Sequence, residues 1–410
     1  MKSILNPDKK NISAIVIVAA LGYFVDVYDL ILFSVVRKPS LLSLGITGDE
    51  QINVGVALLN WQMAGMLIGG ILWGILGDKK GRISVLFGSI FLYSAANIAN
   101  GFVQDVHTYS MLRFIAGVGL AGELGAGITL VSEIMPKESR GWGTMIVATV
   151  GLTGAVVAAL VANKFEWRVS YFVGGALGLI LLILRVSVYE SGMYRNIKDS
   201  SVSKGNFLKL FTDKERFFKF SKCILIGLPT WFVIGVLVTF SDKFAEALGL
   251  KEQINPAQSI MYAYIGIVIG DFASGFLSQV FRTRKKVVML FLIFNLISIT
   301  VYLFFNSHGS FFFYFMCGVL GFSNGYWAVF VTNASEQFGT NFRATVTTAV
   351  PNIIRGTTVP MTLSFQFFRE YTGIIYGAVI VASLVLAIAM TAASRTQETF
   401  GKDLDYVDVV

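Results

Sequence analysis

The sequence predicts an all-α integral membrane protein, with twelve transmembrane helices arranged as two related six-helix bundles. Three observations predict this fold class. Of the 410 residues, 55% are hydrophobic and only 14% are charged, whereas soluble domains carry about 25% charged residues. Twelve apolar stretches reach the length of roughly 20 residues that a bilayer-spanning helix needs. The second half of the chain also repeats short motifs of the first half.

The expected helices follow one another with short polar connections. They are predicted at residues 11–36, 51–76, 83–101, 107–135, 141–162, 169–188, 220–241, 254–280, 286–306, 310–333, 344–368 and 372–393. A polar stretch over 189–219, rich in Lys, Ser and Asn, predicts a cytoplasmic middle loop. We therefore expect an N-terminal bundle over 1–188, a C-terminal bundle over 220–393 and a cytoplasmic tail over 394–410.

The distribution of basic residues predicts the orientation in the membrane. Most of the 33 Lys and Arg residues fall on the side of the two termini, including the cluster from Arg282 to Lys286. Loops rich in Lys and Arg stay on the cytoplasmic side, so both termini are expected in the cytoplasm and the chain in the cell membrane, the inner membrane if bacterial. The net charge of +8 therefore indicates topology and not a nucleic-acid partner.

Two internal repeats indicate that the bundles are related. The segment from Glu133 to Gly141 and the segment from Glu336 to Ala344 share the frame E-x-[MF]-[PG]-x-x-x-R-[GA], at an offset of 203 residues. Phe114-Ile-Ala-Gly-Val likewise pairs with Phe315-Met-Cys-Gly-Val, at an offset of 201 residues. Such duplication is common in secondary transporters.

The turn between the second and third expected helices carries the strongest motif. It runs from Gly74 to Leu86 as G-I-L-G-D-K-K-G-R-I-S-V-L. This resembles the G-x-L-[GSA]-D-[RK]-x-G-R-[RK]-x-x-[LI] loop of major facilitator transporters and departs from it only at Ile83. The resemblance implies two six-helix bundles around a central cavity, which work by alternating access. In the second half Gln279 replaces the acid at Asp78, so we expect unequal cytoplasmic gates.

A set of charged residues near the cytoplasmic ends is predicted to form these gates. A carboxylate such as Asp78 can bind helix N-termini of the other half, and Glu133 with Arg140 can form a salt bridge. The alternative is that the basic residues only fix orientation. The candidate gate residues are Gly74, Asp78, Arg82, Glu133, Arg140, Asp271, Glu336 and Arg343.

Ionisable residues at bilayer depth are functional candidates, because each costs at least about 2.5 to 3.5 kcal/mol to insert. Asp29 and Arg113 both fall roughly 10 Å below the outer surface by helical rise. They resemble the aspartate–arginine pair of proton-coupled sugar porters; a structural salt bridge is the alternative. Asp26 and Glu123 resemble acids of phosphate:proton and metabolite:proton symporters, and one of them is expected to carry the proton or else to bind substrate. These four residues are the proton-coupling candidates.

Arg355 is the main substrate candidate. It falls near the midplane between Pro351 and Pro360, and a guanidinium suits bidentate contact with a carboxylate or phosphate. The alternative is a counter-ion for Asp271 or for an acid of the first helix. Polar and aromatic residues expected with it in the cavity are Tyr28, Trp61, Gln62, Trp231, Asn324, Tyr326 and Trp327.

No pattern indicates an enzyme or a cofactor. Cys223 and Cys317 stand in apolar context without metal-like spacing, and no catalytic constellation is evident. We predict proton-coupled uptake of a small anionic metabolite, such as an organic acid, phosphate or a zwitterion, by a monomer in the lipid bilayer. The alternatives are a proton-driven exporter of a drug or siderophore-like metabolite, and a receptor or sensor that does not transport.

Overall fold

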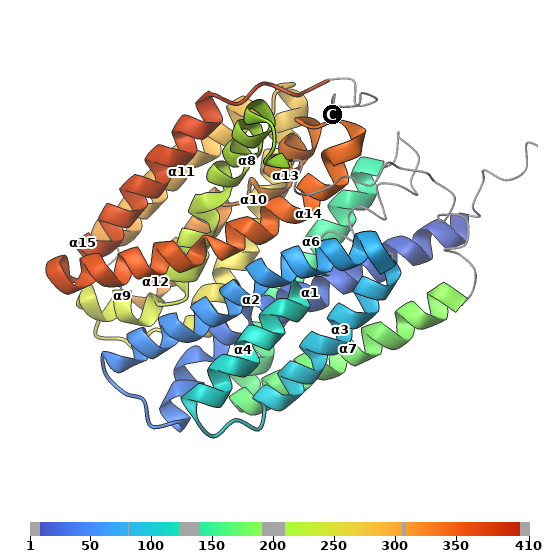
Figure 1. Ribbon diagram of the computed structural model, residues 1–410. Coiled ribbons are helices and arrows are strands. Elements are labelled where there is room, and N and C mark those ends of the chain that lie inside the picture. Colours follow the sequence, from blue (N-terminus) through green and yellow to red (C-terminus); the bar gives the residue numbers. More distant parts are fainter. Residues whose placement is uncertain (1–8, 81, 123–139, 191–209, 306–308, 402–410) are drawn as a thin grey trace, which may run out of the picture.

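The computed structural model describes residues 9–80, 82–122, 140–190, 210–305 and 309–401, and these residues form helices joined by short connections. The first half contains α1 (Lys9–Ser43), α2 (Glu50–Lys80), α3 (Arg82–Asn100), α4 (Val106–Leu120), α6 (Arg140–Lys164) and α7 (Trp167–Glu190). The second half contains α8 (Lys214–Phe232), the π-helix η3 (Val233–Val238), α9 (Ser241–Ala247), α10 (Pro256–Val280), α11 (Lys285–Phe304), α12 (Ser310–Ser323), α13 (Trp327–Glu336), α14 (Thr340–Gly356) and α15 (Thr358–Ser394). The two halves lie side by side as two helix bundles (Figure 1).

The predicted fold class is confirmed, although several expected spans are broken or joined. The span expected at 310–333 is split into α12 and α13 around Asn324 to Tyr326. The spans expected at 344–368 and 372–393 lie in α14 and α15, where Gly373 interrupts the helix with a φ of 82°. Within the described residues nine helical stretches are long and apolar enough to cross a membrane, and the stretch Ala349–Ser394 covers two of the expected spans.

Equivalent helices pack together in the two halves. In the first half α1 packs on α6, and α2 on α4; in the second half α8 packs on α14 and α15, and α10 on α12. The most extensive contacts between the halves are α2 with α14 and α6 with α10. Because α2 corresponds to α10 and α6 corresponds to α14, each of these contacts is the counterpart of the other. The repeats in the sequence predict this symmetry. Because residues 191–209 fall outside the described residues, the limits of the middle loop stay a prediction.

Close approach between helices depends on glycine in corresponding helices of the two halves. A Cβ atom on Gly117 of α4 would lie 2.1 Å from the Gln62 carbonyl oxygen of α2. A Cβ atom on Gly321 of α12 would lie 1.8 Å from the Ala263 carbonyl oxygen of α10. Small residues that let backbones touch are the usual basis of helix packing in lipid.

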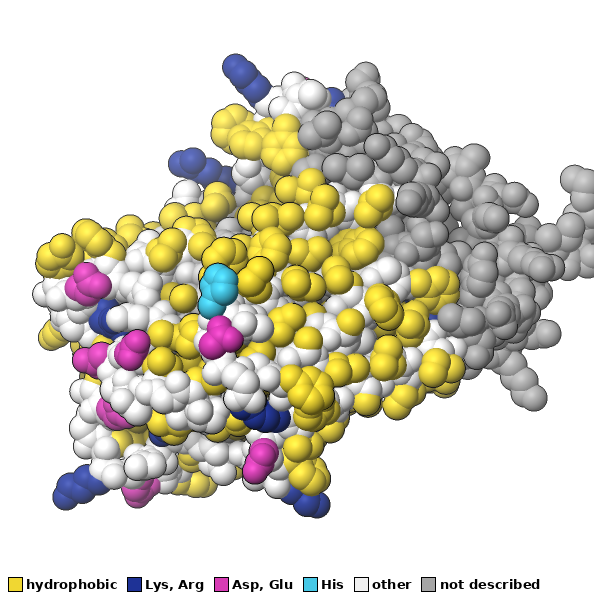
Figure 2. Space-filling model, turned by 60° about the horizontal axis from the view of Figure 1, so that its bottom comes forward, with side chains coloured by type: hydrophobic (Ala, Val, Ile, Leu, Met, Phe, Trp, Pro, Cys, Tyr) yellow, Lys and Arg dark blue, Asp and Glu magenta, His cyan; other side chains and the backbone are white. Residues whose placement is uncertain are grey.

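The outer surface of the bundles is apolar. Large side chains such as Phe272, Phe276, Ile183 and Phe315 are more than half exposed. Figure 2 shows hydrophobic side chains covering most of one face, while charged side chains gather toward the end away from the grey residues. An apolar belt with charges at its edge fits a protein surrounded by acyl chains.

Candidate functional site

A buried ion pair joins the two halves in the interior of the molecule. The Asp26 carboxylate of α1 and the Arg355 guanidinium of α14 lie 3.7 Å apart, with side chains 0% and 3% exposed. Arg355 also donates to the Asn352 side chain at 3.5 Å. Asn352 in turn donates to the Ala121 carbonyl at the end of α4, at 3.0 Å. Charges from one half thus meet polar groups of the other half.

The sequence places Arg355 where α14 and α15 join. Pro351 lies inside α14, and Thr357 separates the two helices. Because proline lacks an N–H group and disturbs the preceding turn, the backbone here departs from a straight helix. Arg355 meets Asp26, an acid of the first helix, as one of the two sequence interpretations proposed.

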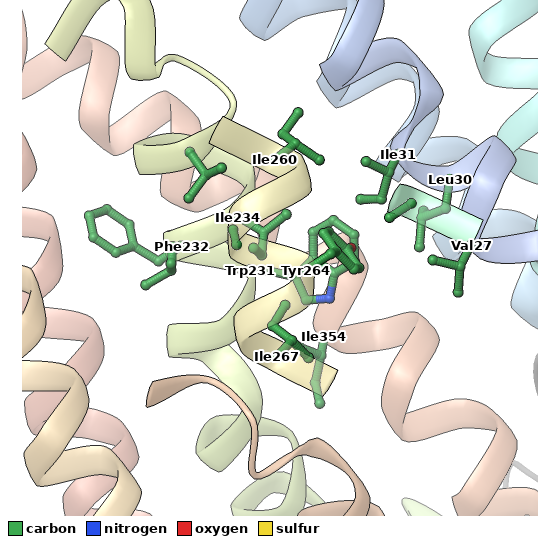
Figure 3. Packing of buried hydrophobic residues seen from close by; sticks show 14 of the residues in the cluster. Val27, Leu30, Ile31, Trp231, Phe232, Ile234, Ile260, Tyr264, Ile267 and Ile354 are labelled. Carbon is green, nitrogen blue, oxygen red and sulfur yellow. The ribbon is translucent and has the colours of Figure 1, made fainter. Parts of the chain in front are cut away.

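Aromatic residues flank this ion pair. Tyr23 of α1 and Tyr264 of α10 are buried and lie within electrostatic range of both Asp26 and Arg355. Trp231 of α8, Tyr264 and Ile354 of α14 belong to the same cluster of buried residues (Figure 3). A cation beside flat aromatic faces can bind an anionic group and an apolar ring at the same time.

Sequence reasoning missed Tyr23, Tyr264 and Asn352. Tyr23 precedes Asp26 by about one helical turn, so the sequence already indicates that the two side chains share one face of the helix. No comparable signal marks Tyr264, because its place beside Arg355 depends on how the halves pack.

Asp29 and Arg113 are both fully buried inside the first half, but they do not touch. Neither Asp29 oxygen and none of the three Arg113 nitrogens has a hydrogen-bond partner within the described residues. Arg113 instead lies 5.6 Å from the ring centres of Phe33 and Tyr171. The two charges therefore share a polar chamber with Asn97, and in this structure they do not form the direct pair considered from the sequence.

The other substrate candidates are scattered. Three of them hold helices together: Tyr28 donates to the Ser170 carbonyl, Gln62 to the Leu30 carbonyl and Tyr326 to the Ile226 carbonyl. Asn324 donates to the Leu320 carbonyl at the end of its own helix, α12. Trp61 is 50% exposed and shares an exposed face of α2 with Ile68 and Leu72. Trp327 packs on Phe330. Of the predicted set, only Arg355 and Trp231 lie where the two halves meet.

Two of the gate candidates make their contacts inside the second half. Asp271 of α10 accepts a hydrogen bond from the Ala328 amide at 3.1 Å, so it caps the N-terminus of α13. Glu336 lies 3.5 Å from Arg284 and accepts a hydrogen bond from Thr399 at 2.6 Å. Glu123 and Glu133 lie outside the described residues. The same holds for the side chains of Asp78, Arg82, Arg140 and Arg343, and for the surroundings of Gly74.

The chain after α15 adds a contact that the sequence did not predict. Glu398 accepts hydrogen bonds from the Thr283 hydroxyl and from the amides of Arg284, at 2.8 Å, and Lys285, at 3.2 Å. Burial alone would raise the pKa of Glu398, but these hydrogen bonds outweigh it and lower the pKa. An ionised Glu398 therefore fastens this segment to the N-terminus of α11.

A membrane helix bundle with an ion pair buried between its two halves is typical of a membrane transport protein. The model of the Major Facilitator Superfamily matches residues 19–357, and the chain belongs to this superfamily. It is a transport protein and not an enzyme.

Known relatives extend over nearly the whole chain. It is 27% identical over 401 residues to a putative metabolite transport protein of Haemophilus influenzae, covering 92% of this chain and 89% of that one. It is 24% identical to a putative niacin/nicotinamide transporter of Bacillus subtilis, covering 93% and 96%. A bacterial homologue of the human lysosomal transporter Spinster, crystallised in an inward-facing and unoccupied conformation, has the same fold, with a TM-score of 0.66 at 13% identity over 98% of this chain and 100% of that one.

Proposed function

We propose that the protein is a proton-coupled symporter that takes up a small organic anion through the site around Asp26 and Arg355. The observation that carries this proposal is the ion pair between the two halves. A carboxylate substrate is chemically equivalent to the Asp26 side chain, so it can replace Asp26 as the partner of Arg355. The aromatic residues beside the pair suit a substrate with a flat apolar part.

Charge balance supports coupling to one proton. With no ligand, Asp26 and Arg355 together are neutral. An anion alone would leave a negative charge at the centre of the membrane, and a proton on Asp26 alone would leave a positive charge. Both states are disfavoured in a low-dielectric interior. An anion bound together with a proton restores neutrality, so the empty and the fully loaded sites are those that reorient.

The orientation proposed here has both termini in the cytoplasm. The described basic residues Lys214, Lys219, Arg282 and Lys286 cluster at the ends of the helices nearest the tail, which agrees with the positive-inside rule. The Asp26 and Arg355 site lies within a single chain, so we propose that the monomer is the working unit.

Niacin and nicotinamide provide a sharp test, because they share a pyridine ring while only niacin carries a negative charge. Proteoliposomes that contain the protein should accumulate radiolabelled niacin under an imposed inward proton gradient, and accumulate nicotinamide much less. The panel should add phosphate, dicarboxylates, amino acids and sugars. Equal transport of neutral and anionic compounds would contradict the anion site, and export driven by the gradient would reverse the direction.

Loss of niacin transport in Arg355→Gln, with normal protein yield, would tie the charge preference to this site. Arg395→Gln is a matched control, since Arg395 lies at an exposed position at the end of α15. Retention of niacin transport in Arg355→Gln would remove Arg355 from substrate binding.

A further inference from the structure

We propose that Arg37 and Asp242 form the gate that closes the transport pathway on the outer side, in the orientation given above. Arg37 lies near the outer end of α1, in the first half, and Asp242 lies in α9, in the second half. Their side chains form an ion pair through Arg37 Nη2 and Asp242 Oδ1. Arg37 also donates from Nε to the Thr239 carbonyl at 3.3 Å, and its guanidinium lies 4.6 Å from the centre of the Phe240 ring.

Every partner that holds Arg37 in this contact comes from the other half. The hydroxyls of Ser34 and Thr239 add a further hydrogen bond between the halves at 3.0 Å. A further contact between the halves, the hydrogen bond from Asn255 to Asn163 at 2.9 Å, is exposed to solvent. The pair of Arg37 and Asp242 therefore forms the buried centre of this closure.

The position of the pair fits a gate. Arg37 follows Asp26 by eleven positions in α1, so a rise of 1.5 Å per residue places it about 16 Å farther along the helix. Ser34 and Thr239, and Arg37 and Asp242, are each 205 residues apart, close to the repeat offsets of 201 and 203. Nearly equivalent positions of the two halves thus meet, as they do at a pseudo-twofold axis. Rocking one half against the other separates such a contact.

The local backbone provides room for the pair. The π-helix η3 precedes Thr239, whose amide donates to the Ile234 carbonyl five residues earlier, at 3.1 Å. Wide turns of this kind redirect the chain that follows and often occur at functional positions. On α2, a Cβ atom at Gly55 would lie 3.1 Å from Arg37 Cδ and 3.2 Å from Phe240 Cε1, so glycine leaves the space that Arg37 needs.

Because the pair of Arg37 and Asp242 is buried, a mutation of either residue should favour the open state of the gate over the closed state. Arg37 is 0% exposed and Asp242 2% exposed, and one atom of each, Nη1 and Oδ2, has no hydrogen-bond partner among the described residues. Removing one charge leaves the other unpaired in the closed gate, which is strongly unfavourable. In an open gate water would solvate that remaining charge. Neutralising either residue should therefore shift the protein toward the state that is open to the outside.

A cysteine below the gate reports this shift without any substrate. In Figure 3 Ile31 of α1 faces the second half, six positions inward of Arg37. We would introduce Ile31→Cys in a Cys223→Ala and Cys317→Ala background, since both native cysteines are buried. Right-side-out vesicles are then treated with a membrane-impermeant maleimide, and the rate of labelling is measured.

We expect Asp242→Asn and Arg37→Gln each to raise the labelling rate by about tenfold or more. The exchange of Arg37→Asp with Asp242→Arg should return the rate toward that of the parent. Lys243→Gln is the matched control, because Lys243 pairs with Glu246 at 2.9 Å within the same short helix and has no ion pair with the described residues of the first half. Its rate should stay unchanged. Each variant must first elute as a monodisperse peak, and the two single variants test the proposal independently.

Labelling of both single variants at the parent rate would overturn the gate. An equal increase in Lys243→Gln would also overturn it, since the effect would then be one of surface charge. Because labelling requires no ligand, either result would leave the proposed anion transport untouched.

Discussion

Arg355 Nη2 and Asp26 Oδ2 face each other across the two halves at 3.7 Å, a distance beyond the usual 2.7 to 3.2 Å of a hydrogen bond. Both side chains are buried, so the attraction is strong, yet the pair lacks the close geometry that would fix it permanently. An ion pair of this kind can be exchanged for a ligand.

Arg355→Lys keeps the positive charge but removes the planar fork of donors. A lysine makes a point contact with a carboxylate, so we expect the KM for niacin to rise about tenfold or more, which corresponds to about 1.4 kcal/mol. Initial uptake rates over a range of niacin concentrations measure this change. An unchanged KM would show that bidentate recognition is not used.

Asp26→Asn removes the internal competitor of the substrate anion. Because Arg355 then lacks its buried counter-ion, we expect niacin to bind more tightly, while accumulation driven by a proton gradient is lost. Equilibrium binding to the purified protein and uptake in proteoliposomes measure these two effects separately. Full gradient-driven accumulation in this variant would exclude Asp26 as the proton carrier and direct attention to Asp29 or Glu123.

Gly174→Ala should disturb the chamber that holds Asp29. A Cβ atom there would lie 2.3 Å from Asp29 Oδ1 and 3.0 Å from Tyr28 Cε1. We expect a loss of stability of about 1 to 3 kcal/mol, as for overpacked interiors, visible as a lower temperature of thermal aggregation in detergent. Gly275→Ala is the control, since nothing lies within 4 Å of its added Cβ atom. Equal stability of the two variants would contradict the tight packing around Asp29.

Glu398 should hold the segment after α15 in a pH-dependent way. Its lowered pKa means that its contribution is fully present above the ordinary glutamate pKa of about 4.3. The contribution is lost as the pH falls through the lowered value. Glu398→Gln should therefore reduce amide protection at Arg284 and Lys285 at pH 7, by less than about 1 kcal/mol for an exposed helix end.

Hydrogen exchange of the peptide over 283–286 measures this protection. Glu370→Gln, at an exposed position of α15, should leave it unchanged. If Glu398→Gln had no effect on these amides, the hydrogen bonds of Glu398 would contribute nothing to holding the segment.

The prediction of the helices was largely successful because a bilayer imposes a simple length rule on the sequence. The places where it failed are local. Gly373 lets one continuous helical stretch contain two expected spans, and the break at Asn324 is stabilised by Asp271 from another helix. A hydropathy pattern does not contain such contacts, because they depend on which helix lies alongside.

The candidate site was predicted only in part for the same reason. Arg355 and Asp26 stand out as buried charges in apolar segments, and the sequence allowed them to be paired. Trp61 stands beside polar residues but faces outward, because the side of a helix that meets lipid is decided by its neighbours. Arg37 follows directly after the first expected helix, and nothing in the sequence indicates its burial against Asp242.

The sequence by itself determined the class of protein, the succession of helices, their duplication and the presence of costly charges in the membrane interior. These properties follow from composition, periodicity and motif, which are local. The tertiary structure alone decided the partners: Asp26 with Arg355, Asp29 within a separate chamber, and Arg37 with Asp242 at the far end. The partners of these charges are far apart in the sequence and become neighbours only when the helices pack. Their pairing therefore depends on the tertiary structure and not on local sequence.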